Sequence, residues 1–276
     1  MNPKTLLLFL TLTLSCTPEK SRKHCTADPD LPGVLYAEYP AADLENLPFT
    51  KDNRIYRDGN TYRFAFTYQS PTGEDLSFAF AEKAEKGKFP WTFKKKTPDC
   101  PDCIVAVEMQ VKPTDKVKYQ SGYQQTEIRY TYLTKSGALN YPSQNTGLIE
   151  NDCNVWLHPP RSGLFRVLEL NPFPHIKKPY EVGHSFESAL KIGSHWQDER
   201  WREWEGSITN QTTYRITEKT VLNIDGPNID CLLTEAKSVS ELGNTYLKTW
   251  FNDTLGFVKY EYTNIDGSKI TLELIS

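Results

Sequence analysis

The chain has 276 residues, and its 32 Lys and Arg against 35 Asp and Glu give a formal net charge of −3. A charge this small gives no support for nucleic acid or an anionic bilayer surface as a partner. Aromatic residues make up 12% of the chain and Met occurs twice, which is typical of strand-rich exported proteins.

The chain begins with an export signal. Lys4 carries a single positive charge, and an apolar run from Thr5 to Leu14 follows. As a helix, this run is too short to cross ~30 Å of hydrocarbon, which needs ~20 residues. It fits the core of a secretory signal. We therefore predict a signal peptide over residues 1–15.

The signal ends in Leu12-Thr-Leu-Ser-Cys16, which resembles a bacterial lipobox, where the cysteine is acylated and becomes the new N-terminus. Thr13 stands where Leu is usual, and a plain cleaved signal peptide is the alternative. The hydrophilic stretch 17–24 favours lipidation of Cys16, because it is typical of a tether between a membrane and a folded body. Thr17 is not the Asp that retains enteric lipoproteins at the inner membrane. We expect a cell-envelope protein anchored in the outer membrane.

After a tether and an irregular segment (16–50), the region 51–150 alternates with the two-residue period of β-strands. Within Thr61–Gln69, four aromatic side chains point to one side: Tyr62, Phe64, Phe66 and Tyr68. Ile104–Val111 and Thr126–Thr134 are further expected strands. This half is predicted to be an N-terminal β region.

The region 151–276 is predicted to be a β meander with short helices. A strand is expected at Leu164–Leu170, and helices at Ser185–Ile192 and Ser194–Trp204. In the second helix, Trp196 and Trp204 would share a face. Short turn-rich connections join the last expected strands, which are Glu205–Glu218, Thr220–Ile224, Ile229–Val239, Asn244–Phe251, Gly256–Thr263 and Lys269–Ile275.

The fold class is therefore mainly β, with curved antiparallel meander sheets and one or two short covering helices. The two β regions form either one continuous domain or two.

Two segments resemble known exported proteins. Thr249–Glu261 is similar to a sequence pattern found in exported bacterial β proteins. Asn154–Trp204, with its Trp-Leu-His-Pro-Pro-Arg run, resembles uncharacterised lipoproteins of the Bacteroidota. The resemblance implies a lipid-anchored protein whose C-terminal half has a curved sheet, similar to the lipoprotein-carrier fold. It implies no catalytic residue.

Six cysteines are present, so five remain if Cys16 carries lipid. Cys100 and Cys103 flank Pro-Asp ahead of an expected strand, whereas a redox pair needs a helix start. We expect a structural disulfide or turn clip there, with a metal half-site or a redox pair as alternatives. The pairing of the other cysteines stays open.

A Cys–His pair can form an activated nucleophile when the two side chains lie within hydrogen-bond reach. Cys153 and His158 are the candidates, but the prolines after His158 and the lack of an orienting acid favour a structural corner. The spacing of the histidines matches no metal motif. We therefore expect no metal, no cofactor and no enzyme, and keep an envelope hydrolase that uses this pair as the alternative function.

Aromatic side chains suggest a binding site. A curved sheet covered by a short helix encloses an apolar cavity of the kind that binds hydrophobic ligands, although an ordinary core would bury the same rings. The expected lining residues are Trp156, Trp196, Trp204 and Trp250. The leading hypothesis is an envelope lipoprotein that binds an apolar small molecule or a partner protein of the envelope.

Overall fold

The computed structural model describes residues 25–80, 91–97, 99–116, 124–138, 143–224 and 226–275. The expected signal peptide, Cys16 and the tether up to residue 24 lie outside the described residues. In the described part of the chain, no helix is long and apolar enough to cross a membrane.

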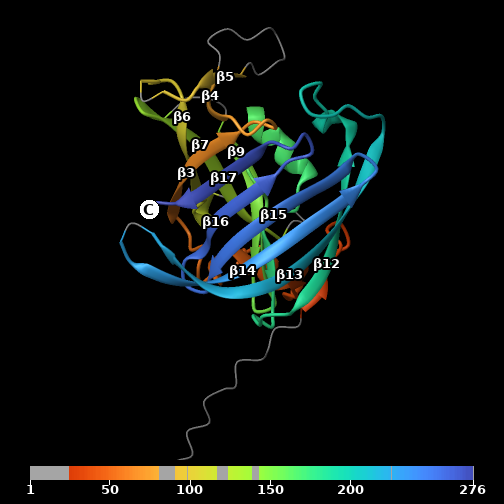
Figure 1. Ribbon diagram of the computed structural model, residues 1–276. Coiled ribbons are helices and arrows are strands. Elements are labelled where there is room, and N and C mark those ends of the chain that lie inside the picture. Colours follow the sequence, from red (N-terminus) through yellow and green to blue (C-terminus); the bar gives the residue numbers. More distant parts are fainter. Residues whose placement is uncertain are drawn as a thin grey trace, which may run out of the picture.

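Most described residues belong to one strongly curved antiparallel sheet of fifteen strands (Figure 1). In spatial order its main path contains β11 (His175–Lys177), β10 (Asn154–Leu157), β9 (Gln144–Glu150), β7 (Thr126–Thr134), β6 (Ile104–Val111), β3 (Thr61–Gln69), β17 (Lys269–Leu274), β16 (Gly256–Thr263), β15 (Gly243–Asn252), β14 (Asn228–Ser240), β13 (Ser207–Asn223) and β12 (Ser185–Gly193). Three further strands lie beside this path: β4 (Asp75–Phe80), β5 (Trp91–Lys95) and β8 (Gly137–Ala138). The predicted mainly β class and curved antiparallel sheet are confirmed.

Strands from both expected regions share this sheet, because β3 pairs with β17 and β10 pairs with β9. A separate hairpin of β1 (Cys25–Ala27) and β2 (Leu35–Ala37) precedes it. The short helices in the described residues are α1 (Ala41–Leu44), α2 (Pro48–Lys51) and the 3₁₀ segments η1 (Thr114–Lys116), η2 (Gly163–Leu170) and η3 (Ser194–Trp196).

The C-terminal meander follows the predicted alternation. In β17, Ile270, Leu272 and Leu274 are buried while the residues between them are more exposed. The two strands expected between residues 205 and 224 form the single strand β13, which passes through a register shift between Ile216 and Glu218. A bulge bends a strand without ending it, and this bend contributes to the curvature of the sheet.

Side chains fill the concave side of the sheet. The alternate aromatic residues of β3 are buried as predicted. The segment Leu164–Leu170, expected as a strand, is instead the 3₁₀ helix η2, and its Phe165 packs against Phe66, Phe78 and Tyr132. All residues of η2 except Arg166 are buried, because the helix lies inside the curl instead of adding a strand to it.

Two predicted helices are wrong. Residues 185–192 form strand β12, where Phe186 stacks on Tyr214 of β13 at 4.8 Å. The expected helix at 194–204 is only the 3₁₀ turn η3, followed by a tight turn. There the Asp198 side chain accepts the backbone N–H of Arg200, and this local hydrogen bond competes with helix formation.

The curl brings the two edge strands close together and leaves a seam between them. In β11, the ring centre of His175 lies 4.9 Å from that of Phe186 in β12 and 5.4 Å from that of Tyr214. Side chains, not a ladder of backbone hydrogen bonds, therefore join the described edges β11 and β12.

Candidate functional site

A segment that we call the strap, residues 25–37, crosses the seam. The amide of Ala189 in β12 donates to the carbonyl of Pro32, and Lys177 Nζ, from β11, donates to the carbonyl of Gly33 at 3.0 Å. The strap backbone runs so close to β12 that a Cβ on Gly33 (φ +93°) would lie 2.2 Å from the carbonyl oxygen of Glu187. The strap thus contacts both edges of the sheet.

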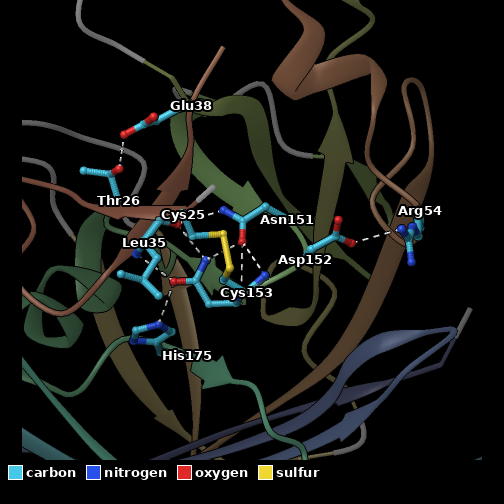
Figure 2. Close-up of a disulfide and its surroundings, with 10 residues drawn as sticks. Cys25, Thr26, Leu35, Glu38, Arg54, Asn151, Asp152, Cys153 and His175 are labelled. Carbon is cyan, nitrogen blue, oxygen red and sulfur yellow. Dashed lines mark hydrogen bonds and ion pairs between the residues drawn. A yellow bond between two sulfur atoms is a disulfide. The ribbon is translucent and has the colours of Figure 1, made fainter. Parts of the chain in front are cut away.

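The strap is bonded covalently to the sheet. Cys25 forms a disulfide with Cys153 in the turn before β10, and around it Asn151 and Asn154 hydrogen-bond the backbone of Leu35 (Figure 2). The carboxamide oxygen of Asn154 accepts the Leu35 amide at 2.8 Å. These contacts fix the N-terminal hairpin on the turn between β9 and β10.

The disulfide overturns the hydrolase hypothesis. The sulfur of Cys153 is bonded to Cys25, so it is not the free thiolate that a nucleophile requires. The His158 ring packs between Trp156 and Phe173, with ring centres 6.2 and 4.7 Å away. The pair is therefore structural.

A cavity of about 520 Å³ lies at the seam; we call it the seam cavity. Its size is within the range of ligand pockets, roughly 300–1,000 Å³. The strap, the sheet near β7, β9 and β10, the η2 region and β12 all contribute to its walls. Its lining includes Leu31, Glu127, Trp156, His158, Arg161, Glu169, Phe173, Leu190 and Trp196.

Two titratable side chains, the mostly buried His158 and the buried Glu169, meet in the cavity wall. His158 Nε2 lies 3.4 Å from Glu169 Oε1, while its Nδ1 is 2.8 Å from the carbonyl oxygen of Pro159. We assign the ring proton to Nδ1 from this geometry. Burial lowers the pKa of His158 to about 3 and raises the pKa of Glu169 to about 8. Both side chains are therefore mainly uncharged at neutral pH.

Cationic side chains surround Trp196, which comes from η3. The guanidinium carbons of Arg161 and Arg166 lie 5.7 and 5.4 Å from the centre of its indole. Arg166 Nη2 also donates to the carbonyl of His195, and Arg161 Nη2 donates to that of Asn145 at 3.3 Å. This end of the cavity combines an aromatic wall with fixed positive charge.

The four tryptophans expected to line a cavity do not gather in one place. Trp156 and Trp196 both line the seam cavity. Trp204 is buried in the main core, and Trp250 lies on β15 beneath Lys259, whose Nζ is 5.0 Å from its ring centre. Trp204 was misplaced because its expected position relied on a helix that does not form.

A second cavity, about 420 Å³ in volume, lies beside β5 and includes Trp91, Phe93, Tyr68 and Trp201 among its lining residues. The rings of Trp91 and Trp201 are nearly parallel, with centres 6.4 Å apart. Arg200 covers Trp91 at 3.8 Å and also pairs with Asp198. The Arg200 guanidinium therefore already has an aromatic and an acidic partner within the protein.

The remaining described cysteines are structural. Cys100 and Cys103 form a disulfide in a tight turn. Asp102 lies near both sulfurs, but a bonded pair offers no thiolates for a metal. Cys231 is buried without a disulfide partner among the described residues, and burial raises the pKa of its thiol to about 11. It is therefore poorly reactive.

Sequence reasoning missed Glu169, Phe173 and the strap residues of the seam cavity. Glu169 is the one acidic residue in the otherwise apolar run Val167-Leu-Glu-Leu170. A lone carboxyl in such a run was the available signal, because charged residues are rarely buried unless they are paired.

No protein-family model matches the sequence, and no curated protein matches it. Among solved structures, similar chains include a protein from Bacteroides fragilis described as exported and as having a YmcC-like fold (11% identity, TM-score 0.41, 80% of this chain and 95% of that one). The hypothetical lipoprotein YmcC from Escherichia coli is 10% identical (TM-score 0.32, 87% and 99%). A protein from Parabacteroides distasonis described as a lipoprotein is 16% identical (TM-score 0.38, 80% and 96%). Likeness at this level carries no inference about function.

Proposed function

We propose that this chain is a lipid-anchored protein of the cell envelope that binds a small amphipathic ligand in the seam cavity and catalyses no reaction. The seam cavity carries the proposal, because it combines a ligand-sized volume with the aromatic walls of Trp156 and Trp196 and buried polar groups. The concave side of the sheet is filled by core side chains, which favours the seam as the binding place.

The lipobox-like sequence at Cys16 supports the anchor, and Thr17 favours the outer membrane. Only eight residues, 17–24, separate Cys16 from Cys25, which is bonded to the body. Nine residue steps span at most ~30 Å when fully extended. An acylated Cys16 would therefore hold the strap, and the cavity beneath it, near the membrane surface.

Native mass spectrometry of the protein extracted gently from membranes tests both parts of the proposal. We expect an intact mass that includes acyl chains on Cys16, and a non-covalent adduct of small-molecule mass. Leu190→Trp, which adds bulk to the cavity wall, should abolish the adduct. Ser185→Trp, at an exposed position on the same strand, should retain it. A wild-type protein that is always empty would contradict ligand binding, and a mass without acyl chains would contradict the anchor.

A further inference from the structure

The arginines beside Trp196 have polar groups directed to backbone carbonyls rather than to carboxylates. Among the described residues, neither Arg161 nor Arg166 forms an ion pair with a carboxylate, and the Nε atoms of both are buried without a hydrogen-bond partner. Two positive charges around one indole favour an anion over a cation at this end of the cavity. Arg166 also lies near enough to Asp198 to lower the pKa of that carboxyl, so a neutral ligand would leave mainly the charge of Arg161, which lines the cavity, uncompensated.

Glu169 does not supply the missing negative charge. It is 4% exposed and lines the cavity, and its Oε1 accepts no hydrogen bond among the described residues because the neighbouring His158 Nε2, 3.4 Å away, carries no proton. Burial raises the pKa of this carboxyl more strongly than the two neighbouring arginines lower it. A protonated carboxyl carries an O–H donor, and since Oε1 faces His158 Nε2, a proton on Oε2 can be donated to an anionic oxygen that Arg161 holds.

Other charged groups line the cavity on several elements: Asp28 and Asp30 on the strap, Glu127 on β7 and Lys191 on β12. Asp28 Oδ1 already accepts the amides of Asp30 and Leu31. Asp30 is exposed, so water screens its charge. Glu127 is half-buried on β7, whereas Arg161, whose Nε is buried, lies at the Trp196 end of the cavity beside Glu169, so we place the anion at that end.

The remaining lining is apolar. Leu31, Phe173 and Leu190 come from the strap, the segment after η2 and β12, and they accompany the two tryptophans. Burying a hydrocarbon chain against such walls is favourable because it removes apolar surface from water. Polar and apolar recognition are thus both present in one cavity.

We infer that the ligand of the seam cavity has an anionic headgroup, a carboxylate or a phosphate monoester, on an apolar tail, and that Arg161 and Glu169 bind this headgroup. This inference rests on the proposed binding function.

Titration calorimetry with four probes that share a ten-carbon chain tests the headgroup: decanoate, decyl phosphate, decanol and decylamine. We expect binding of at least one of the two anions, about tenfold or more tighter than decanol or decylamine, which corresponds to about 1.4 kcal/mol. The stronger anion identifies the headgroup. If decanol binds as tightly as both anions, the headgroup inference is wrong while ligand binding stands. The headgroup inference is also wrong if decylamine binds more tightly than both anions. It is likewise wrong if none of the four probes binds while the native mass spectrum shows an adduct.

The variant Arg161→Gln tests whether Arg161 binds the headgroup. It should weaken decanoate binding about 10- to 100-fold and leave the affinity for decanol unchanged. Arg200→Gln, which removes the arginine over Trp91 outside the seam cavity, should change neither. An unchanged affinity for decanoate in Arg161→Gln, with a folded spectrum, would contradict the role of Arg161.

The pH dependence separates Glu169 from a merely structural residue. Wild-type affinity for decanoate should fall as the pH rises from 7 to 9, because Glu169 loses its proton with a pKa of about 8. Glu169→Gln keeps amide N–H donors and cannot ionise, so its affinity should stay constant over this range. An identical pH profile in both proteins would contradict the role of Glu169.

Discussion

At the scale of single residues, burial in the seam prevents the ionisation of a histidine. His175 is 1% exposed in the seam, where its Nε2 lies 3.3 Å from Asn154 Oδ1. Burial lowers its pKa from 6.5 to about 3. The sequence contains no pattern for this, since a histidine between two proline-rich turns is equally compatible with the surface.

The pH dependence of stability tests the burial of His175. Its folded pKa lies below its unfolded pKa, so the unfolded state binds more protons between about pH 3 and 6.5. The free energy of unfolding should therefore fall as the pH falls through this range, by up to ~1.4 kcal/mol per pH unit for each such histidine. His175→Gln should flatten this dependence in urea denaturation series measured at several pH values.

His158 has the same shift from the same cause, so replacing both histidines should flatten the profile further. Glu169 acts in the opposite direction between about pH 4.5 and 8, and each variant is therefore compared with the wild type at every pH. An unchanged slope in His175→Gln would show that the imidazole is accessible to water.

Elements with a regular period could be predicted, and those fixed by distant contacts could not. Gly256–Thr263 was predicted with the bounds of β16, because its turn and alternation are local signals. In the segment 185–192, the order of polar and apolar residues is compatible with the period of a helix and with that of a strand. Its pairing with β13 makes it a strand. The strap looked irregular, since its side-chain partners lie 116 to 119 residues away, in the turn before β10 and at the start of β10.

The disulfide of the strap is expected to contribute more stability than that of the turn. Cys25 and Cys153 are separated by 128 positions, whereas Cys100 and Cys103 are separated by 3. Constraint of the unfolded chain grows with loop length. Replacing Cys25 and Cys153 by Ser should lower the free energy of unfolding by about 2–5 kcal/mol, measured by urea denaturation.

Replacing Cys100 and Cys103 by Ser is the matched control, and its effect should be smaller. Equal losses in the two double variants would contradict a special role of the strap in closing the sheet.

At the scale of the whole molecule, one curved sheet holds about half of the described residues (Figure 1), and the strap contacts both of its edges. The sequence predicted the class and the curvature, but not that the edges would come together. That closure depends on the fit of His175, Phe186 and Tyr214 across the seam. The seam cavity lies between these edges, and Trp156 and Trp196, which lie beside them, line it.

The central claim is that the seam cavity holds a small molecule in the cell. A photoreactive benzoylphenylalanine at position 190, in the cavity wall, tests it by irradiation of living cells followed by mass spectrometry of the purified protein. We predict an adduct of small-molecule mass at position 190 and none at position 185, which lies outside the cavity. Crosslinks at position 190 only to other proteins, or the same adduct at both positions, would contradict the claim.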